Sequence, residues 1–577
     1  MFWRRWTWFV IGVLSASVLA GAVAAMVLRS GGAAPGERAE GSFVRAVDLS
    51  PLDRSAVWNE GRLKSFDAFA TEMLSYISGR SRVFGQPTDF TYLDMVFRGE
   101  RYAAAPVIYI KNKEMRGQLA AALESASAMT REEGEAFFKS GMISERQLSH
   151  PESEGLIRRW SMDMVRTAKH ADAIMSARGL RRPEVLLDQL QMIPPPSGRS
   201  DHPWLSLGEM WQPGGMMRPA DAEIPGLDAG LRAELRGSME SLSRSWRALD
   251  AAGVNSAVER LASVLSSVAP SVYPEPARMA LQSYYFRAQN MTWVWLVYFV
   301  SLIFLVMSVA YRWEAARGLG MGFFAVAFVL HTVALGWRWY VAGRWPNSNM
   351  FEAVTTSVWL GTIAVLVLEY AARRTPMRNL FALGGAAASM CALMAAHYVP
   401  QLNASINNMM PVLHDLWLYI HTNVIIASYA LIAMASVTAV LYLVHRMLGG
   451  TASYARVGGA ASLIESATPG LSRRVGLSEV FDGATMVLME LSFVLLWAGI
   501  VMGAIWADHS WGRPWGWDPK EVFALNTFLV FLVLVHVRLK VRDKGLWTAL
   551  LAIAGCGVML FNWIVINFVI SGLHSYA

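Results

Sequence analysis

The sequence predicts an all-α polytopic membrane protein with about nine transmembrane helices and a mostly helical extracytoplasmic domain between the first and the second. Hydrophobic residues make up 54% of the 577 residues, charged residues only 16%, and the mean hydropathy is +0.33. These values are too apolar for a soluble protein. The apolar residues gather in runs of about 20, the length that crosses a bilayer. In the apolar half, the basic residues behind the net charge of +7 lie largely in short loops, which is typical of cytoplasmic loops facing anionic lipid and not of nucleic-acid binding.

The first span is expected at the N-terminus. Arg4 and Arg5 precede an apolar run over about Trp6–Val27. An alanine-rich end would permit cleavage as a signal peptide, but the run is nearly as long as the bilayer is thick, so we favour an uncleaved anchor over residues 1–28. The two arginines place the N-terminus inside and the following residues outside.

Residues 29–290 are polar and charged and are predicted to form the extracytoplasmic domain. Apolar residues recur every three or four positions and indicate helices over Arg62–Ile77, Lys113–Ser127, Glu154–Ala177 and Leu231–Val268. The best strand candidate is Ala105–Lys111. The histidines of this part lack metal-ligand spacing and are interpreted as surface residues: His150, His170 and His202.

Residues 291–577 are predicted to form a membrane bundle of eight further spans. These are expected at Met291–Tyr311, Met321–Val341, Ala353–Tyr370, Leu380–Val399, Leu416–Val444, Ala484–Trp506, Val522–Val541 and Trp547–Ile570. With the anchor this places the C-terminus outside, and the densest basic loops then fall inside. A tryptophan-rich stretch at 506–521, the loop 400–415 and the tail 572–577 are therefore expected to share the outer face.

The stretch 506–521 carries four tryptophans within twelve residues: Trp506, Trp511, Trp515 and Trp517. A dense interfacial belt would explain them, but four rings on one Gly/Pro-rich loop favour a platform for a flat, apolar, polarisable ligand. Asp518 either caps the next helix or, with Lys520 and Glu521, orients this loop.

Two histidines are expected on either side of this platform. His421 lies in the outer part of its span and His574 just after the last span. Two neutral imidazoles can bracket a haem iron, although a hydrogen-bonded structural role is open for each. His536 lies deeper, toward the inner face, and His331 lies mid-membrane. Three histidines near the outer loops are rivals for the ligand role: His397, His414 and His509.

Cysteine usage excludes two functions. Cys391 and Cys556 sit alone in separate apolar runs. Without a Cys-x-x-Cys motif the chain is not a usual dithiol oxidoreductase, and without Cys-x-x-Cys-His it carries no covalently attached c-type haem. Zinc is disfavoured, because no cysteine or carboxylate cluster completes a tetrahedral site.

The segment Trp511-Gly-Arg-Pro-Trp-Gly-Trp-Asp-Pro-Lys-Glu521 resembles the WWD signature of haem-handling membrane proteins. Five other segments, beginning at His331, Gly343, His421, Val535 and Gly572, narrow the resemblance to the CcsA/ResC family of system II cytochrome c synthesis. The resemblance covers about residues 320–577.

This resemblance implies that reduced haem b, as substrate and bound ligand, is exported and presented on the outer face of the cytoplasmic (inner) membrane of a bacterium. There it is joined to Cys-x-x-Cys-His motifs of apocytochromes c by a holocytochrome c synthase (haem lyase). By motif position His421 and His574 resemble the external haem ligands, and His536 resembles the ligand of a haem within the membrane. The expected partners are apocytochrome c, a ResB/CcsB-type subunit and a thiol-reducing thioredoxin-like protein.

The second ligand for the inner haem is an open point. Neither the N-terminal span nor Met291–Tyr311 contains a histidine, so a separate ResB-type protein supplies it or the inner site differs, with His331 a less favoured substitute. Residues 29–290 are interpreted as a docking surface for apocytochrome or that partner. Two alternative functions are a system I type protein that delivers haem to a chaperone or lyase, and a non-haem transporter whose tryptophans form only a belt.

Overall fold

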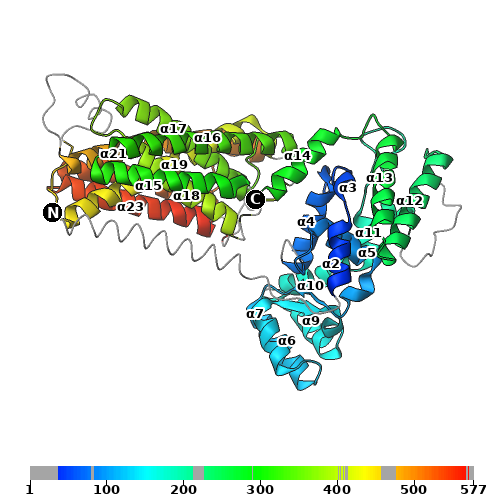
Figure 1. Cartoon of the computed structure of the whole chain (residues 1–577). Helices are drawn as coiled ribbons and strands as arrows, with labels where there is room; N and C mark the ends of the chain where they lie inside the picture. Colours follow the sequence, from blue (N-terminus) through cyan, green and yellow to red (C-terminus); the bar gives the residue numbers. More distant parts are fainter. Residues whose placement is uncertain are drawn as a thin grey trace. The chain divides into compact units, whose positions relative to one another are not determined.

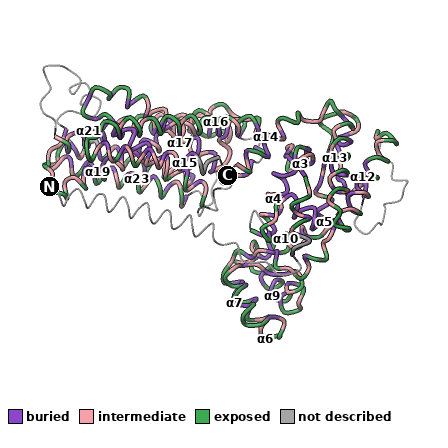
Figure 2. The backbone as a smooth tube through the Cα atoms, viewed as in Figure 1, coloured by how far each residue is buried: buried purple, intermediate pink, exposed green. Residues whose placement is uncertain are grey.

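The computed structural model describes residues 37–566, except 80–82, 165, 212–225, 289, 400–401, 403, 407, 410–412 and 456–475, together with residue 570. Contacts divide the chain into two compact units, Met1–Ser283 and Tyr284–Ala577. Each unit is built around its own buried residues (Figures 1 and 2). The predicted anchor, residues 1–28, lies outside the described residues.

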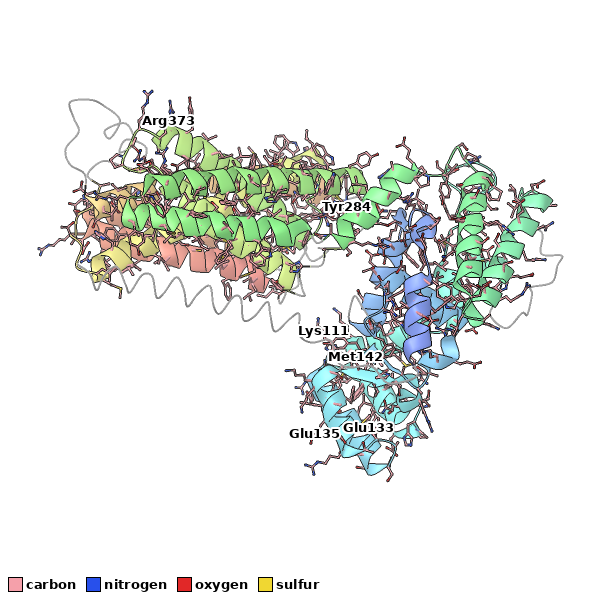
Figure 3. The ribbon with its side chains drawn as sticks, viewed as in Figure 1. Lys111, Glu133, Glu135, Met142, Tyr284 and Arg373 are labelled. Carbon is pink, nitrogen blue, oxygen red and sulfur yellow. The ribbon has the colours of Figure 1, made fainter. Side chains whose placement is uncertain are left out.

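The first unit is mostly helical. Its helices are α2 (Glu37–Ala46), α3 (Ser50–Asp53), α4 (Phe66–Ser78), α5 (Thr88–Phe97), α6 (Lys113–Ser125), α7 (Arg131–Ser140), α8 (Glu145–Leu148), α9 (Pro151–Met162), α10 (Ala168–Leu180), α11 (Pro183–Gln189), α12 (Ala229–Arg247) and α13 (Ala251–Val268), with short 3-10 turns at η1 (Gly99–Tyr102) and η2 (Leu207–Glu209). The boundary between the units falls within α14 (Pro276–Arg287). Local caps fix several starts: at α7, Thr130 and Glu133 bond each other's backbone N–H in a capping box. Figure 3 labels Glu133 on this helix.

The first unit also contains four short strands, so the prediction of an all-α chain was wrong in detail. β1 (Ala56–Asn59) pairs antiparallel with β2 (Arg62–Ser65), and β3 (Pro106–Tyr109) pairs antiparallel with β4 (Met142–Ser144). The helix predicted over Arg62–Ile77 begins only at Phe66, because its first four residues form β2. The strand predicted at Ala105–Lys111 is present as β3.

Two long predicted helices are each broken into a pair. The stretch 154–177 turns between α9 and α10, and 231–268 turns between α12 and α13, where Leu249 has a positive φ of 57°. Periodicity did not show these turns, because both helices of each pair bury apolar residues in one shared core.

The core of the first unit surrounds Trp246, which is fully buried. Its ring packs against Phe43, Phe90 and Phe97 at centroid separations of 5.0–5.7 Å, and its indole N–H donates to Asp94 Oδ1 at 2.8 Å. Asp94 also accepts from Tyr102 Oη at 2.7 Å and from Arg98 Nε at 2.6 Å. Burial and the Asp94 carboxylate raise the pKa of Tyr102 well above its ordinary value, so its hydroxyl remains the donor.

The second unit is a bundle of eight helices, each long and apolar enough to cross a membrane. They are α15 (Asn290–Tyr311), α16 (Glu314–Ala342), α17 (Met350–Ala372), α18 (Leu380–Tyr398), α19 (Leu416–Met447), α21 (Leu477–Trp511), α22 (Pro519–Lys540) and α23 (Lys544–Phe561), and α23 continues into a π-helical turn, η4 (Asn562–Ile566). The eight spans predicted for residues 291–577 are confirmed as candidate spans. The ninth remains a prediction.

Small residues let the helices of the bundle approach closely. A Cβ added to Gly361 on α17 would lie 2.6 Å from Ala430 Cβ on α19, and one added to Gly499 on α21 would lie 2.5 Å from Ile425 on α19. Such close approach supplies the van der Waals packing that holds membrane helices together.

A buried ion pair joins two of the helices. Near the C-terminal end of α22, Arg538 is buried and forms a bidentate pair with Asp482 of α21, at 2.8 and 2.6 Å.

Replacing Asp94 with alanine is expected to destabilise the first unit by about 3 kcal/mol, because two buried donors and the partly buried Arg98 lose their common acceptor. For a unit of this size the midpoint of thermal unfolding should fall by about 6–12 °C. The matched control is Asp201→Ala, which removes an exposed pair with Arg199 and should shift the midpoint by little. Equal shifts in the two variants would contradict the role given to Asp94.

Candidate functional site

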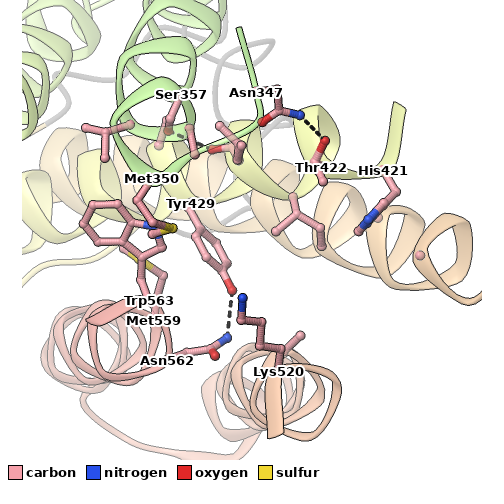
Figure 4. A pocket seen from close by; sticks show the side chains of 18 of the residues that line it. Asn347, Met350, Ser357, His421, Thr422, Tyr429, Lys520, Met559, Asn562 and Trp563 are labelled. Atoms are coloured by element: carbon pink, nitrogen blue, oxygen red, sulfur yellow. Dashed lines mark hydrogen bonds between the residues drawn. The ribbon is translucent and has the colours of Figure 1, made fainter. Parts of the chain in front are cut away.

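The bundle contains a cavity of about 390 Å³. Helices α17, α18, α19, α21, α22 and α23 line it, together with the segments that precede α17 and α22 (Figure 4). Its walls are mostly apolar, and a few polar side chains face into it: Asn347, His421, Tyr429, Lys520 and Asn562. A mostly apolar cavity of this size with few polar groups is typical of a site for an organic ligand.

His421 is the cavity's imidazole. It lies in the second turn of α19, and its ring stacks on Trp506 of α21 at a centroid separation of 5.7 Å and an interplanar angle of 18°. Gly503 stands one turn before Trp506, where an added Cβ would be 3.1 Å from His421 Nδ1. A side chain at position 503 would therefore press on the imidazole. Glycine at position 503 therefore leaves the space beside the imidazole ring open.

The four predicted platform tryptophans do not form one flat surface. Helix α21 continues to Trp511 and ends at Gly512, which has a positive φ of 68°, so Trp506 and Trp511 belong to the helix and not to a loop. Trp511 packs on the buried Trp506 at 4.8 Å between centroids. Trp515 lines the cavity, whereas Trp517 is 73% exposed. Trp506 and Trp515 are thus the two of the four that line the cavity.

The stretch after the tryptophans is organised by a helix cap. Asp518 is buried, its side chain accepts from Lys520 N at 3.2 Å, and Glu521 bonds back to the Asp518 backbone N–H at 3.1 Å. This is the capping role predicted for Asp518. Lys520 and Glu521 both line the cavity.

The loops predicted to share the outer face do meet. Met409 and Leu413, from the segment predicted as an outer loop, pack in one cluster with Leu418 and the buried Trp506. His509 Nδ1 lies 3.7 Å from Asp415 Oδ2, and Asp415 caps the start of α19. The cavity thus has a wall made of chain segments about 100 residues apart.

A second wall depends on a buried carboxylate, Glu352, in the first turn of α17. Glu352 accepts from Arg338 of α16 at 2.9 Å, from Arg344 at 2.8 Å, and from the backbone N–H and hydroxyl of Ser348 at 2.8 and 3.0 Å. Arg338 also donates to the backbone carbonyls of residues 404 and 405 at 2.8 and 3.0 Å. One carboxylate therefore ties the segment before α17 to α16 and, through Arg338, to the loop between α18 and α19.

The same segment reaches the cavity beside the imidazole. Asn347 donates a side-chain hydrogen bond to Thr422, the residue after His421 (Figure 4). Asn347 also lines the cavity. Sequence analysis used the segment that begins at Gly343 for the family resemblance but assigned no role to Asn347 or Glu352. The signal was available, because an acid next to an apolar span is by default functional or paired.

The remaining predicted residues lie away from the cavity. His331 is fully buried within α16, and His536 is exposed on α22, with Nδ1 2.7 Å from the carbonyl oxygen of Leu532. His574 lies outside the described residues. Of the histidines that the structure describes, only His421 lines the cavity, so none of the rivals does so: His397, His414 and His509.

Among the residues of the first unit that the structure describes, one group of carboxylates lies close enough to share a cation. Asp53, Asp67 and Asp89 are buried, with oxygens within 4.8 Å of one another. Each of the three also takes part in further interactions, so their proximity alone does not indicate a metal site.

Comparison with known proteins places this cavity in a family. The profile of the cytochrome c assembly protein family matches residues 347–574, which include His421, the tryptophan stretch and α23. A cytochrome c biogenesis protein CcsA of Synechococcus sp. (strain CC9605) is 33% identical over 293 residues, covering 48% of this chain and 93% of that protein. The chain belongs to the cytochrome c assembly protein family. Similar relatives named CcsA come from Synechococcus elongatus (31% over 290 residues; 45% of this chain, 87% of the relative) and Guillardia theta (31% over 263 residues; 45% and 85%).

The function of this cytochrome c assembly protein is cytochrome c biogenesis of the CcsA type, in system II. The matches cover the C-terminal half of the chain. They thus coincide with the membrane bundle and its cavity, the part from which the resemblance was predicted.

Replacing Glu352 with alanine is expected to destabilise the bundle of this cytochrome c assembly protein by about 3–5 kcal/mol, because two guanidinium groups are left in the interior without their carboxylate. The thermal unfolding midpoint of the detergent-purified protein reports the loss. Glu314→Ala is the control, since Glu314 forms exposed pairs with Arg317 and Arg378 whose removal should cost under about 1 kcal/mol. A Glu352 variant as stable as the control would show that the network is not structural.

Proposed function

We propose that the cavity beside His421 holds haem b, as substrate and bound ligand, and presents it at the outer face of the membrane for attachment to Cys-x-x-Cys-His apocytochromes c. The observation that carries this proposal is the pairing of one imidazole with one buried indole on the wall of a mostly apolar cavity. Imidazole is a standard axial ligand of haem iron, and aromatic rings favour flat conjugated ligands. Gly503 keeps the space next to the imidazole open.

The residues present suit such a ligand. His421 would supply one axial nitrogen, and His574, by its motif position, the other. Trp506 and Trp515 would contact the macrocycle, and the alanines and glycines of α19 and α21 leave the cavity wide. In this proposal His421 is a ligand and the tryptophans are positioning residues.

The proposed reaction is addition of a cysteine thiol across a vinyl group of the haem. The S–H bond breaks, sulfur bonds to the vinyl carbon next to the ring, and the proton goes to the terminal carbon, so no electrons are gained or lost. Such a step needs alignment of the reacting atoms more than a protein acid or base. The protein would act as the holocytochrome c synthase, or haem lyase, component, by holding the vinyl edge where thiols reach it.

The proposal includes partners and an orientation. The protein would lie in the inner membrane of a bacterium, with the tryptophan stretch on the periplasmic side. A thioredoxin-like protein would keep the thiols reduced, and a ResB/CcsB-type subunit would complete the inner haem site. His536 supports the last point, because its side chain is exposed on α22, where a ligand from another chain can reach the same iron.

The absorption spectrum of the detergent-purified protein tests the ligand assignment. His421→Ala should lose or weaken the low-spin haem bands, and added imidazole should restore them. His414→Ala is the matched control, because His414 is an exposed histidine just before α19 and should leave the spectrum unchanged. Bands that survive in His421→Ala would refute the assignment, and a protein free of haem even when co-expressed with partners would favour a non-haem transporter.

A gentler variant tests the geometry without removing the ligand. In Gly503→Ala the new methyl group would lie 3.1 Å from His421 Nδ1, so the imidazole must shift by a few tenths of an ångström. Haem affinity, measured by titration, is expected to fall about tenfold, or about 1.4 kcal/mol, while the fold is retained. Gly557→Ala on α23 has no atom within 4 Å of its new Cβ and should bind as the wild type does. Equal affinity in both variants would show that His421 does not face the ligand.

A further inference from the structure

A cluster of polar side chains lies deep in this otherwise apolar cavity. Tyr429 comes from α19, Asn562 from η4 and Lys520 from the first turn of α22, and all three line the cavity. Asn562 Nδ2 donates to Tyr429 Oη at 2.9 Å. Figure 4 shows the amine of Lys520 directed toward this pair. We call these three residues the polar floor.

Tyr429 lies farther along α19 than the imidazole, and Lys520 is directed toward it from the first turn of α22 (Figure 4). Tyr429 follows His421 by eight residues on the same helix, a distance of about 12 Å along the axis. Asn562 is buried and begins the π-helical turn that follows α23. Single π turns are rare and occur frequently at functional sites.

The polar floor is rich in hydrogen-bond donors. Because the Tyr429 oxygen accepts from Asn562, its own O–H hydrogen is left to donate. Asn562 has a second amide hydrogen, and the Lys520 ammonium has three. A lysine within a membrane span is costly and by default has a functional counter-charge.

The nearby acids accept hydrogen bonds from backbone amides. Glu521 accepts from the N–H groups of Gly516 and Asp518 at 2.8 and 3.1 Å, and Asp518 accepts from the N–H of Lys520 at 3.2 Å. Asp518 also attracts the Lys520 ammonium and offsets part of its charge. The N-terminus of α22 adds the positive end of its dipole, so the charge and the hydrogen-bond donors of the polar floor suit a carboxylate.

We infer that the polar floor of Lys520, Tyr429 and Asn562 binds the propionate carboxylates of the haem, so that the molecule sits with its acidic edge toward the membrane interior. This inference rests on the proposed function. The two propionates share one edge of the macrocycle, and the vinyl groups lie on other edges. Seating the acids about 12 Å below the level of His421 turns the vinyl-bearing part toward Trp515 and the outer mouth. The polar floor thereby selects a dicarboxylate porphyrin and fixes which edge meets the thiols.

The experiment compares two probes in the purified full-length protein: haem and haem dimethyl ester, whose carboxylates are masked. The wild type should bind haem at least tenfold more tightly than the ester, as measured by the absorbance change on titration. Lys520→Met should lose this preference while the ester complex keeps the spectrum of His421 ligation. Lys520→Arg should retain the preference, because it retains the cation. Lys540→Met, at the exposed inner end of the same helix, should behave as the wild type.

Tyr429→Phe removes one hydrogen-bond donor with little change of shape. It should reduce the preference for haem over its dimethyl ester about threefold, the effect of losing one neutral hydrogen bond. If Lys520→Met fails to fold, Tyr429→Phe is the variant that tests the polar floor. A preference unchanged in Lys520→Met, or in Tyr429→Phe when that variant decides, would overturn the polar floor while leaving haem binding at His421 intact. Failure of the proposed function looks different: neither probe would then give a spectrum sensitive to His421→Ala in any variant.

Discussion

The end of the bundle that carries His421 depends on one buried carboxylate, Glu352. It stands in the first turn of α17 with two arginines and a backbone amide directed at it. Removing one carboxylate and two guanidinium groups from water is costly, and the cost is offset only when nearly every donor and acceptor finds a partner. Here the remaining Arg338 donors reach the carbonyls of residues 404 and 405. The network therefore admits few alternative arrangements, and this restriction makes the segment from Arg344 to Asn349 a rigid wall of the cavity.

A similar arrangement closes the opposite end of the bundle. Arg538 forms an ion pair with Asp482. It also donates hydrogen bonds to the carbonyl oxygen of Ala455 at 2.9 Å and to the hydroxyl of Thr548. These contacts join α21, α22 and α23 where His536 stands two residues from Arg538. Polar networks hold both ends of the bundle together. The helices between them can therefore present glycine and alanine to a cavity without closing it. A cavity in a membrane bundle needs such support, because apolar packing alone favours filling it.

Much of this architecture could be predicted from the sequence. Hydropathy alone placed the eight candidate spans, since each is a long apolar run bounded by charge, and position relative to the outer loops was enough to favour His421. The cap at Asp518 followed from the residues Asp-Pro-Lys-Glu. Helix ends were less predictable: Trp506 and Trp511 were assigned to a loop because tryptophan suits an interface, yet Gly512 ends the helix only after them.

Long-range pairing was the part that sequence could not supply. The residues next to Glu352 in the sequence do not indicate that it pairs with Arg338 and Arg344 and not with water. The π turn at Asn562 has no simple residue signature either. In the first unit, the turn at Leu249 was hidden because α12 and α13 bury apolar faces in the same core. These features arise from tertiary packing, which overrides local preference.

The length of α21 has a consequence for where the chemistry takes place. Its 35 residues extend about 52 Å, whereas the hydrocarbon core of a bilayer is about 30 Å thick. Most of the charged residues of α21 lie toward its two ends, so the excess length is expected to extend past the hydrocarbon. The 32-residue α19 is also longer than the core is thick, and His421 lies near the start of α19 and Trp506 near the end of α21. A water-soluble polypeptide could then reach the proposed ligand beside these residues without entering the hydrocarbon core of the bilayer.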